Sequence, residues 1–456
     1  MKVVKFGGSS VASATQYKKV ASILAADPER KAVIVSAPGK RHAEDTKTTD
    51  LLIRLADSVG ERDFNEEAFQ AVLKRYRDII EELELDSSLM TEVEGHLHEV
   101  ISMYRQSKDR LLDGLKASGE DLNAKVMTAY LQSLGRKATY ISPKKAGMIV
   151  TDEPGNAQIL PEAYPEIAKL RDIEGLLVIP GFFGYSYEGN IVTFPRGGSD
   201  ITGSIIAAGL DATEYENFTD VDSIYCVSPK MVDKPRELKE LTYREMRELA
   251  YSGFSVFHDE ALQPVVHKKI PVCVKNTNRP EARGTRIVAS RELDGRPVIG
   301  IASDEGFCSI NMTKYLMNRE LGFGRRLLAI LEDEGVSYEH TPSGIDNMSV
   351  IVRSHQLYNG QEARVLNRIR EELQVDELYV ERDLAMIMVV GEGMNQTIGI
   401  ASKATQALAQ AGANIKMINQ GSSEVSMMFG VNVEDVERAV QSLYHIYFPA
   451  EVGQEV

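Results

Sequence analysis

Two pairs of glycines, each following a short apolar strand, are the first residues in this chain whose types and spacing could do chemistry. Lys5 precedes Gly7 and Gly8 in the segment KFGGSSV, and Arg196 precedes a second glycine pair in FPRGGSD. Glycines let backbone N–H groups approach an anion closely, and the start of a following helix adds a favourable dipole. We therefore expect phosphate binding near Lys5 and, because guanidinium suits it, carboxylate binding near Arg196.

Ordinary structural roles are the alternative for both turns. A lysine before two glycines is common in simple turns, and Ser199 or Asp200 could serve as the N-cap of a helix. The chain contains neither the P-loop pattern GxxxxGK[ST] nor the dinucleotide pattern GxGxxG. A third segment, NFTDVDSIY, places Thr219 and Asp220 just after an apolar strand, where ligands of open α/β sheets bind. A simple turn explains that segment equally well, so no one segment is decisive.

The elements that must position these residues alternate between strands and helices. A helix is expected to begin near Val11, and residues 50–134 are mostly helical in pattern. This alternation predicts an α/β fold with one large, mostly parallel sheet covered by helices. The strands are expected at 3–6, 32–39, 138–141, 176–180, 191–194, 215–218 and 272–274.

The region after residues 294–298, DGRPV, contains an internal repeat. A shift of 412 − 335 = 77 residues pairs Gly335 with Gly412, and the same shift pairs Ser349 with Ser426. Each copy predicts strand, helix, strand, strand and helix, so we expect two tandem βαββα modules. The predicted boundaries are 1–295 for the first domain and 296–380 and 381–456 for the modules, with the C-terminal end returning to pack against the first module.

Composition and charge exclude several classes of function. The chain has 456 residues, and 67 acidic against 52 basic side chains give a net charge of −15, which disfavours nucleic acid as a partner. The longest near-apolar run, 176–185, is about half of the roughly 20 residues that a membrane helix needs. The segment MKVVKFGG lacks the apolar stretch of a secretory signal. Three scattered cysteines, Cys226, Cys273 and Cys308, fit a reduced, cytoplasmic setting.

Several segments in order resemble one family. KFGGSSV, the stretch from Val178 to Asp200, FTDVDSIY, HDEAL and RGT together resemble the aspartokinases of the amino-acid kinase family. The resemblance spans essentially the whole chain, and the tandem modules resemble the ferredoxin-like βαββαβ ACT domains that give such enzymes feedback control. The monofunctional, lysine-responsive branch is the most similar.

The resemblance implies a reaction and its cofactor. The β-carboxylate of L-aspartate would attack the γ-phosphate of magnesium ATP, giving 4-phospho-L-aspartate and ADP at the head of lysine, threonine and methionine biosynthesis. A carboxylate of pKa about 3.9 is already ionised near neutrality, so no general base is needed. Positioning and charge neutralisation must then do the catalysis. Magnesium should arrive with the nucleotide, and no protein-built metal site is expected, since His96 and His98 have no third ligand nearby.

The resemblance also implies roles for individual residues. Lys5 would neutralise the transferring phosphoryl group, and Asp200 would hold that lysine in place. Gly7, Gly8 and Ser9 would supply backbone donors to ATP. Helix capping remains the alternative for two of the substrate contacts, Glu120 and Thr49. The implied contacts to aspartate are Arg196 and Ser199 at the α-carboxylate, Glu120 at the ammonium, and Thr49.

The nucleotide contacts depart from the family pattern in two places. Thr219, Asp220 and Tyr225 match the family, but Ser228, Pro229 and Lys230 replace an aspartate, proline and arginine, so Lys230 would keep the charge without bidentate geometry. Ser255 stands where many relatives have an ATP-contacting lysine. Lys275, in VKNTN, could compensate, with a surface lysine as the alternative.

Regulation would rest on the modules, which also suggest a homodimer or a dimer of dimers. Lysine is the first choice of effector and threonine the second, because an acidic pair such as Glu320 and Glu339 suits an ammonium group. Two rival functions stay open: acetylglutamate kinase, which shares the fold class, and a catalytically inactive amino-acid sensor, which Ser255 would explain. The candidate effector residues are Met317, Glu320, Phe323, Gly324, Ser337, Tyr338 and Glu339.

Overall fold

The computed structural model describes residues 1–60, 63–195, 197–254, 256–257, 259–293 and 295–449. The chain divides into two compact units. The first comprises Met1–Ile224, Glu237–Arg247 and Ser255–Arg291, and the second comprises Tyr225–Arg236, Glu248–Phe254 and Glu292–Val456. Each unit is described by itself below.

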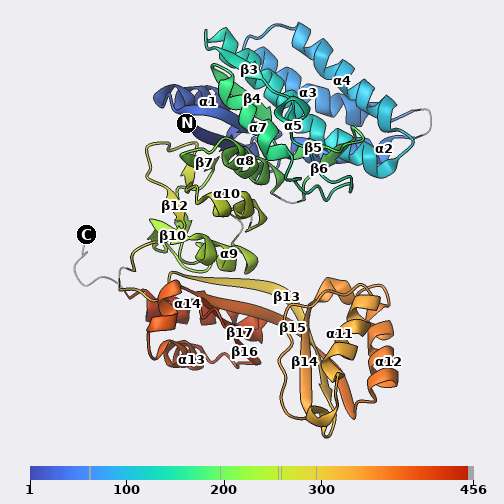
Figure 1. Cartoon of the computed structure of the whole chain (residues 1–456), viewed down its shortest axis with the longest axis vertical. Coiled ribbons are helices and arrows are strands. Elements are labelled where there is room, and N and C mark those ends of the chain that lie inside the picture. Colours follow the sequence, from blue (N-terminus) through green and yellow to red (C-terminus); the bar gives the residue numbers. More distant parts are fainter. Residues whose placement is uncertain (61–62, 196, 255, 258, 294, 450–456) are drawn as a thin grey trace. The chain divides into compact units, whose positions relative to one another are not determined.

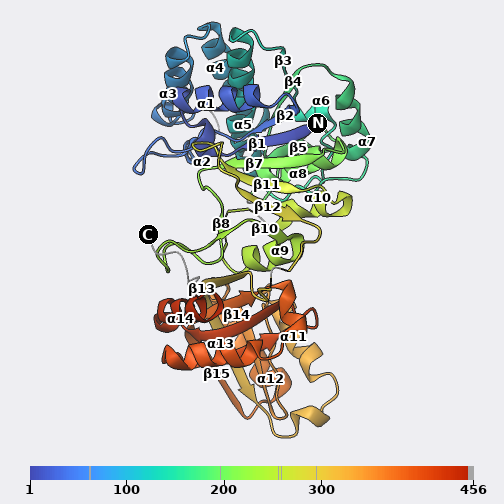
Figure 2. The ribbon, with the colours of Figure 1, turned by 90° about the vertical axis from the view of Figure 1, so that its left-hand side faces the viewer.

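An eight-stranded sheet forms the centre of the first unit. Its strand order is β10-β12-β11-β7-β1-β2-β4-β3, and Figure 2 shows β2, β1, β7, β11, β12 and β10 following one another. All neighbouring pairs are parallel except β11 and β12. The mostly parallel sheet expected from the sequence is therefore confirmed. The strands are β1 Lys2–Phe6, β2 Arg30–Val35, β3 Ala138–Tyr140, β4 Leu176–Pro180, β7 Glu214–Thr219, β10 Glu240–Thr242, β11 Val272–Asn276 and β12 Thr285–Val288.

Helices cover both faces of this sheet because its strands are apolar on both sides. One face packs Val4, Phe6 and Val33 into a core shared with α1 and α5. On the other face α8 lies against β7, where Gly203 leaves room for the Tyr215 ring: a Cβ at Gly203 would come within 2.4 Å of the Tyr215 hydroxyl oxygen. The helices are α1 Ala14–Ala26, α2 Thr48–Ser58, α3 Glu66–Glu82, α4 Ser88–Tyr104, α5 Lys108–Ser133, α6 Pro143–Ala146, α7 Ala163–Ala168, α8 Gly198–Gly209, α9 Tyr243–Tyr251 and α10 Gln263–Lys268.

Two local predictions differ from the structure. The first α-helix begins at Ala14 rather than near Val11, because Gly8–Val11 forms a separate 3₁₀ turn, η1. The strand expected at 191–194, β6 (Ile191–Thr193), does not join the large sheet. It pairs with β5 (Phe183–Tyr185) in a two-stranded hairpin. A short apolar run indicates a strand but not its partner.

The second unit contains one five-stranded antiparallel sheet, in the order β14-β13-β15-β17-β16. The expected repeat is present: α11 begins at Phe323 and α13 at Ile400, and 400 − 323 = 77. Figure 1 shows the helix pair α11–α12 over one end of the sheet and the pair α13–α14 over the other. The elements are β13 Gly300–Thr313, α11 Phe323–Asp333, β14 Asn347–Arg353, α12 Gln361–Leu373, β15 Glu377–Val390, α13 Ile400–Gln410, β16 Met417–Gln420, β17 Ser426–Asn432 and α14 Val436–Tyr447.

Two long strands, β13 and β15, belong to both copies of the repeat. The pairing of β13 with β15 shifts register between Glu305 and Phe307 and again between Phe307 and Ser309, and Asp383 adopts a left-handed backbone conformation (φ 55°) opposite the second shift. On one side of the irregularity β13 pairs with β14 as well as with β15. On the other side β15 pairs with β17 as well as with β13. Each copy of the repeat therefore completes its sheet with half of a strand that also serves the other copy.

No helix in the described part of the chain is long and apolar enough to cross a membrane.

Candidate active site

A cavity of about 680 Å³ lies at the carboxyl ends of β1 and β2. We call it the catalytic cavity. The starts of three helices line it. Ser9, Thr49 and Ser199 are each the second residue of their helix, η1, α2 and α8 respectively. Helix N-termini present unpaired N–H groups and positive dipole ends, so this arrangement favours anions. Its lining is Lys5, Gly8, Ser9, Ser36, Ala37, Pro38, Gly39, Lys40, His42, Ala43, Lys47, Thr49, Glu120, Phe182, Gly197, Gly198, Ser199, Asp200 and Asp220.

Lys5 and Asp200 meet at the centre of the catalytic cavity. Lys5 Nζ lies 2.5 Å from Asp200 Oδ1, and both side chains are largely buried. Lys5 points from β1 toward α8, and Asp200 extends back from the first turn of α8. The structure thus brings together the two residues that the sequence placed in one catalytic pair. A buried ammonium held by one carboxylate is fixed in position and can contact a further anion.

Asn217, which the sequence analysis did not single out, completes this pair. Its amide donates to Asp200 Oδ1 at 3.0 Å, and its amide oxygen accepts from Lys5 Nζ at 3.4 Å. Parallel pairing of β1 and β7 sets Lys5 directly beside Asn217. The signal was available in the segment NFTDVDSIY, because a polar residue inside an apolar strand needs a polar neighbour.

The glycine turn after β1 is available to an anion only in part. Gly7 N–H donates to Phe218 O at 3.0 Å, so in this conformation it is not free for a phosphate, and its role as a donor to ATP stays a prediction. Gly8 and Ser9 line the catalytic cavity. Gly39 lies directly behind them, and a Cβ at Gly39 would come within 2.6 Å of the Gly8 carbonyl carbon. The close approach of two backbones forms a cradle that phosphate oxygens could enter.

Glu120 is a buried carboxyl group on the wall of the catalytic cavity. It is 5% exposed and lies in the middle of α5, so the helix-capping alternative is wrong. One of its oxygens, Oε2, has no hydrogen-bond partner among the described residues. Burial raises the pKa of Glu120 to about 8, although the backbone N–H of Ala37 favours the ionised form. An unpaired buried carboxyl group that faces a cavity is suited to a cationic group of a ligand.

The remaining predicted aspartate contacts lie in first helical turns. Ser199 lines the catalytic cavity inside α8, whose N-cap is Gly197, so neither Ser199 nor Asp200 is a capping residue. Thr49 lines the cavity from the first turn of α2, where Lys47 is the N-cap, so the capping alternative is also wrong for Thr49. Arg196 lies outside the described residues.

Phe182 is a second wall residue that the sequence analysis missed. It has a left-handed backbone (φ 78°), which is rare for a bulky residue, and it lines the catalytic cavity. Its N–H donates to the Thr202 hydroxyl at 2.9 Å. A Cβ at Gly198 would come within 2.4 Å of the Phe182 ring. Strained residues of this kind cluster at functional sites, where the surrounding packing holds them.

The predicted nucleotide contacts are divided between the two units. Asp220 lines the catalytic cavity, and its side chain accepts from the Thr219 hydroxyl at 3.3 Å. Tyr225 and Lys230 belong to the second unit. Ser255 lies outside the described residues. Lys275, which could compensate for it, pairs with Glu216 (3.8 Å) in this structure and lines a separate groove that also holds Arg30.

The candidate effector residues lie around the start of α11 and the segment that follows this helix. Met317 and Phe323 are buried in the apolar core of the first repeat, so packing accounts for their side chains. Tyr338 is exposed, the Ser337 backbone N–H donates to Gln356, and Gly324 begins α11 next to Phe323.

The two glutamates proposed for an effector ammonium already have basic partners. Glu320 pairs with Lys314 (2.6 Å) and Arg326, and these bonds hold the pKa of Glu320 below its usual value. Glu339 pairs with Arg353 at 3.3 Å. An effector ammonium at either glutamate would have to share or displace these partners, so the assignment of Glu320 and Glu339 to the effector stays a prediction.

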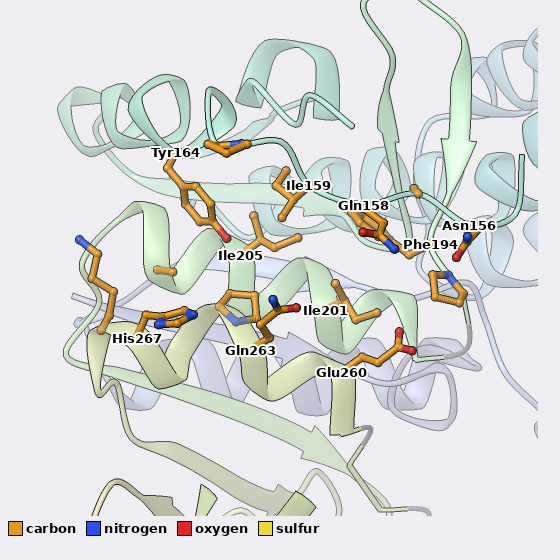
Figure 3. A pocket seen from close by; sticks show the side chains of 16 residues that line it. Asn156, Gln158, Ile159, Tyr164, Phe194, Ile201, Ile205, Glu260, Gln263 and His267 are labelled. Carbon is orange, nitrogen blue, oxygen red and sulfur yellow. The ribbon is translucent and has the colours of Figure 1, made fainter. Parts of the chain in front are cut away.

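A second cavity of the first unit, about 550 Å³, lies behind α8 (Figure 3). Ile201 and Ile205 form its floor, while Tyr164 faces Gln263 and His267 of α10 across the opening. None of the residues with predicted chemistry line it. The sides of α8 thus differ: Ser199 and Asp200 face the catalytic cavity, and Ile201 and Ile205 face this second cavity. Among the residues that the structure describes, no three His, Cys, Asp or Glu side chains gather as a metal site.

The catalytic cavity combines a held lysine, open backbone N–H groups and an unpaired carboxyl group, which suits transfer of a phosphoryl group to a small zwitterionic acid. Comparison with known proteins agrees. Residues 1–276 match the model of the amino acid kinase family, and residues 387–447 match an ACT domain. Aspartokinase 3 of Bacillus subtilis is 55% identical over 98% of this chain and 99% of its own length.

Solved structures give the same result. Clostridium acetobutylicum aspartate kinase has a TM-score of 0.86 and 37% identity, covering 98% of this chain and 100% of its own. Escherichia coli aspartokinase III, solved with aspartate and ADP, has a TM-score of 0.81 and 25% identity, covering 98% and 100%. The same E. coli enzyme solved with lysine and aspartate has a TM-score of 0.77 and 25% identity, covering 98% and 99%.

The chain belongs to the amino acid kinase family, and within that family it is an aspartokinase. It is therefore an enzyme that phosphorylates L-aspartate from a nucleoside triphosphate, under the regulation that ACT domains provide.

Proposed function

We propose that Lys5 neutralises the γ-phosphoryl group of ATP while it passes to the β-carboxylate of L-aspartate, and that Asp200 fixes Lys5 for this task. The observation that carries the proposal is the 2.5 Å ion pair between the two side chains beside the glycine turn. Asn217 holds both partners, so Lys5 has one favoured position. Because the attacking carboxylate is already ionised near neutral pH, electrostatic stabilisation and alignment supply the acceleration.

The charge of each group of ATP and of aspartate indicates which residues of the catalytic cavity would bind it. Gly8 and Ser9 offer backbone N–H groups to the phosphates, while Glu120 receives the ammonium of aspartate. Ser199 and Thr49, at two helix starts, donate to carboxylate oxygens, with Arg196 as the predicted guanidinium partner. Thr219, Asp220, Tyr225 and Lys230 remain predicted contacts of ATP.

Magnesium is proposed to enter with ATP. Two of the carboxyl groups that line the catalytic cavity, Asp200 and Asp220, would fit an ion that keeps most of its ligands as phosphate oxygens and water. When bound, the ion would supply positive charge that offsets the negative charge on the phosphates during transfer.

The regulatory proposal concerns the modules. We infer lysine as the effector, because the E. coli enzyme was solved with lysine, and threonine as the second candidate. A homodimer or dimer of dimers through the modules, the domain boundaries at 295 and 380, and a cytoplasmic setting remain predictions. Effector binding can lower activity only by favouring a conformation whose catalytic cavity is poorly arranged.

A hydroxamate assay tests the reaction directly. Hydroxylamine traps an acyl phosphate, so product should form with ATP and L-aspartate and not with acetylglutamate. Product with acetylglutamate would favour the acetylglutamate kinase alternative. Binding of lysine without any hydroxamate would favour an inactive sensor.

A further inference from the structure

The loop between β2 and α2, residues 36–47, forms one wall of the catalytic cavity. Lys40, His42 and Lys47 line the cavity from this loop. Its two ends are tied together, because Thr48 N–H donates to Pro38 O at 3.1 Å. Gly39 N–H donates to Gly8 O at 2.8 Å and so joins the loop to the phosphate-binding turn. Movement of this loop would therefore disturb both the cavity wall and that turn.

Arg75 holds the loop from behind. It lies in α3, is 3% exposed and does not line the catalytic cavity. Its guanidinium donates to Gly39 O at 3.3 Å and to Thr46 O at 2.6 Å, and it forms an ion pair with Asp45 at 2.9 Å. One planar group thus joins the first and last parts of the loop.

A second arginine supports this contact from the loop itself. Asp45 also accepts from the backbone N–H of Arg41 at 3.0 Å and from its side chain at 2.9 Å. These bonds, with those from Arg75, hold the pKa of Asp45 well below its usual range, so Asp45 stays ionised. Arg41 continues to Asp78 of α3 at 3.0 Å. The loop is therefore fastened to α3 at two points.

Burial of a guanidinium is costly unless each donor finds an acceptor. Arg75 meets that condition only when the loop adopts this conformation, because two of its acceptors are loop carbonyl groups. A lysine could not satisfy them together, since its single ammonium lacks the planar fork. The arginine thus favours one loop arrangement over others.

We propose that Arg75 is a positioning residue for aspartate phosphorylation: it fixes the loop of residues 36–47 so that Thr49 and the glycine cradle meet the substrate in a productive arrangement. The proposal rests on the aspartokinase activity and adds a residue outside the cavity to it. Loss of Arg75 removes none of the groups that contact substrate. It lets the loop that positions them move.

The test compares Arg75→Met and Arg75→Lys with Arg77→Met, an exposed neighbour on α3 with no ion pair among the described residues. We expect Arg75→Met to raise KM for aspartate about tenfold, a typical effect of misplacing a binding group. Arg75→Lys should recover part of the loss, and Arg77→Met should match the wild type. Hydrogen exchange followed by mass spectrometry should show faster exchange in peptides covering 39–48 and unchanged exchange in α5.

Unchanged KM in Arg75→Met, with the loop still protected, would overturn the proposal. If Arg75→Met does not fold, Asp45→Asn can be used instead. Asp45 is only partly buried, and its replacement removes the same ion pair with Arg75. A raised KM with local loss of protection in Asp45→Asn supports the proposal, and wild-type values for both overturn it. Failure of the hydroxamate assay in the wild type would instead refute the activity itself, so the two failures are distinguishable.

Discussion

Lys5 of β1 and Asp200 of α8 form an ion pair at 2.5 Å, and Asn217 of β7 contacts both of them. Three elements from different parts of the chain thus converge on one ammonium group. The parallel register of β1 with β7 and the close packing of α8 on β7 at Gly203 together produce this convergence.

Replacement of Lys5 by alanine should lower kcat about a hundredfold to a thousandfold, the usual cost of removing one preorganised electrostatic contact. KM for aspartate should change much less, because Lys5 is assigned to the transferring phosphoryl group. Steady-state kinetics by the hydroxamate assay measure both. Lys2→Ala is the matched control, since Lys2 lies on the same strand and pairs with Asp27 instead. Equal kcat values for the two variants would contradict the role of Lys5.

The affinity for aspartate should depend on pH through Glu120. Its pKa of about 8 means that the free carboxyl group is mostly protonated at pH 6, and it must lose that proton to pair with the substrate ammonium. KM for aspartate should therefore fall roughly tenfold per pH unit as the pH rises toward 8, and then level off. Glu120→Gln should raise KM and remove this dependence. A flat wild-type profile between pH 6 and 8 would refute the assignment.

The same group should reduce stability in the absence of substrate. Because the folded pKa of Glu120 is raised from 4.5 to about 8, its contribution to stability is present below pH 4.5 and is lost as the pH rises to 8. Glu120→Gln should thus melt at a higher temperature than the wild type at pH 8.5, with little difference at pH 4.5. Circular dichroism melts at the two pH values measure this. A variant that is less stable at pH 8.5 would show that the buried carboxyl group has a hidden partner.

Of two glycine substitutions, one should lower the activity and the other should raise the stability. Gly39→Ala places a Cβ within 2.6 Å of the Gly8 backbone, so it should reduce kcat/KM by shifting the phosphate-binding turn. Gly95→Ala, in the middle of α4, meets no atom within 4 Å and should stabilise the protein by about 0.5–1 kcal/mol with unchanged activity. Kinetics and urea unfolding measure the pair. Full activity of Gly39→Ala would exclude the close approach of the two backbones as a catalytic requirement.

Glu339→Ala should weaken inhibition by lysine and leave uninhibited turnover unchanged. Its partner Arg353 also pairs with Asp304, so the module retains a network when Glu339 is removed. Inhibition curves with lysine and, separately, with threonine measure the effect. Glu332→Ala, on the exposed side of α11, is the control. If both variants respond to lysine as the wild type does, Glu339 is not part of the effector site.

The large sheet and the repeat could be predicted because both depend on local patterns. Alternation of apolar strands with helices indicated the parallel sheet, and a constant shift of 77 residues paired the helices of the two copies correctly. Lys5 could be singled out because a lysine beside a glycine turn suits an anion, whereas the role of Asp200 followed from the resemblance to the aspartokinases. The hairpin of β5 and β6 was missed because β5 has only three residues, too few to show a strand pattern separate from β4.

Other site residues depend on neighbours that only the fold supplies. Asn217 acts through register with Lys5, and Phe182 through its packing on Gly198. The sequence suggests Gly7 as a phosphate donor, but in the fold its N–H donates to Phe218 O. Arg75 lies in a charged helix where nothing in the sequence distinguishes it from Arg77, yet only Arg75 is buried.

The strands β13 and β15 each serve both copies of the repeat, which limits how the regulatory half can be rebuilt. Neither copy can form its sheet alone. A cut in the gene at the boundary between them would remove from each product half of a strand that its sheet needs. Chimeras that exchange effector response between relatives must therefore transfer residues 300–447 as one piece, and crossovers inside that stretch should yield insoluble protein.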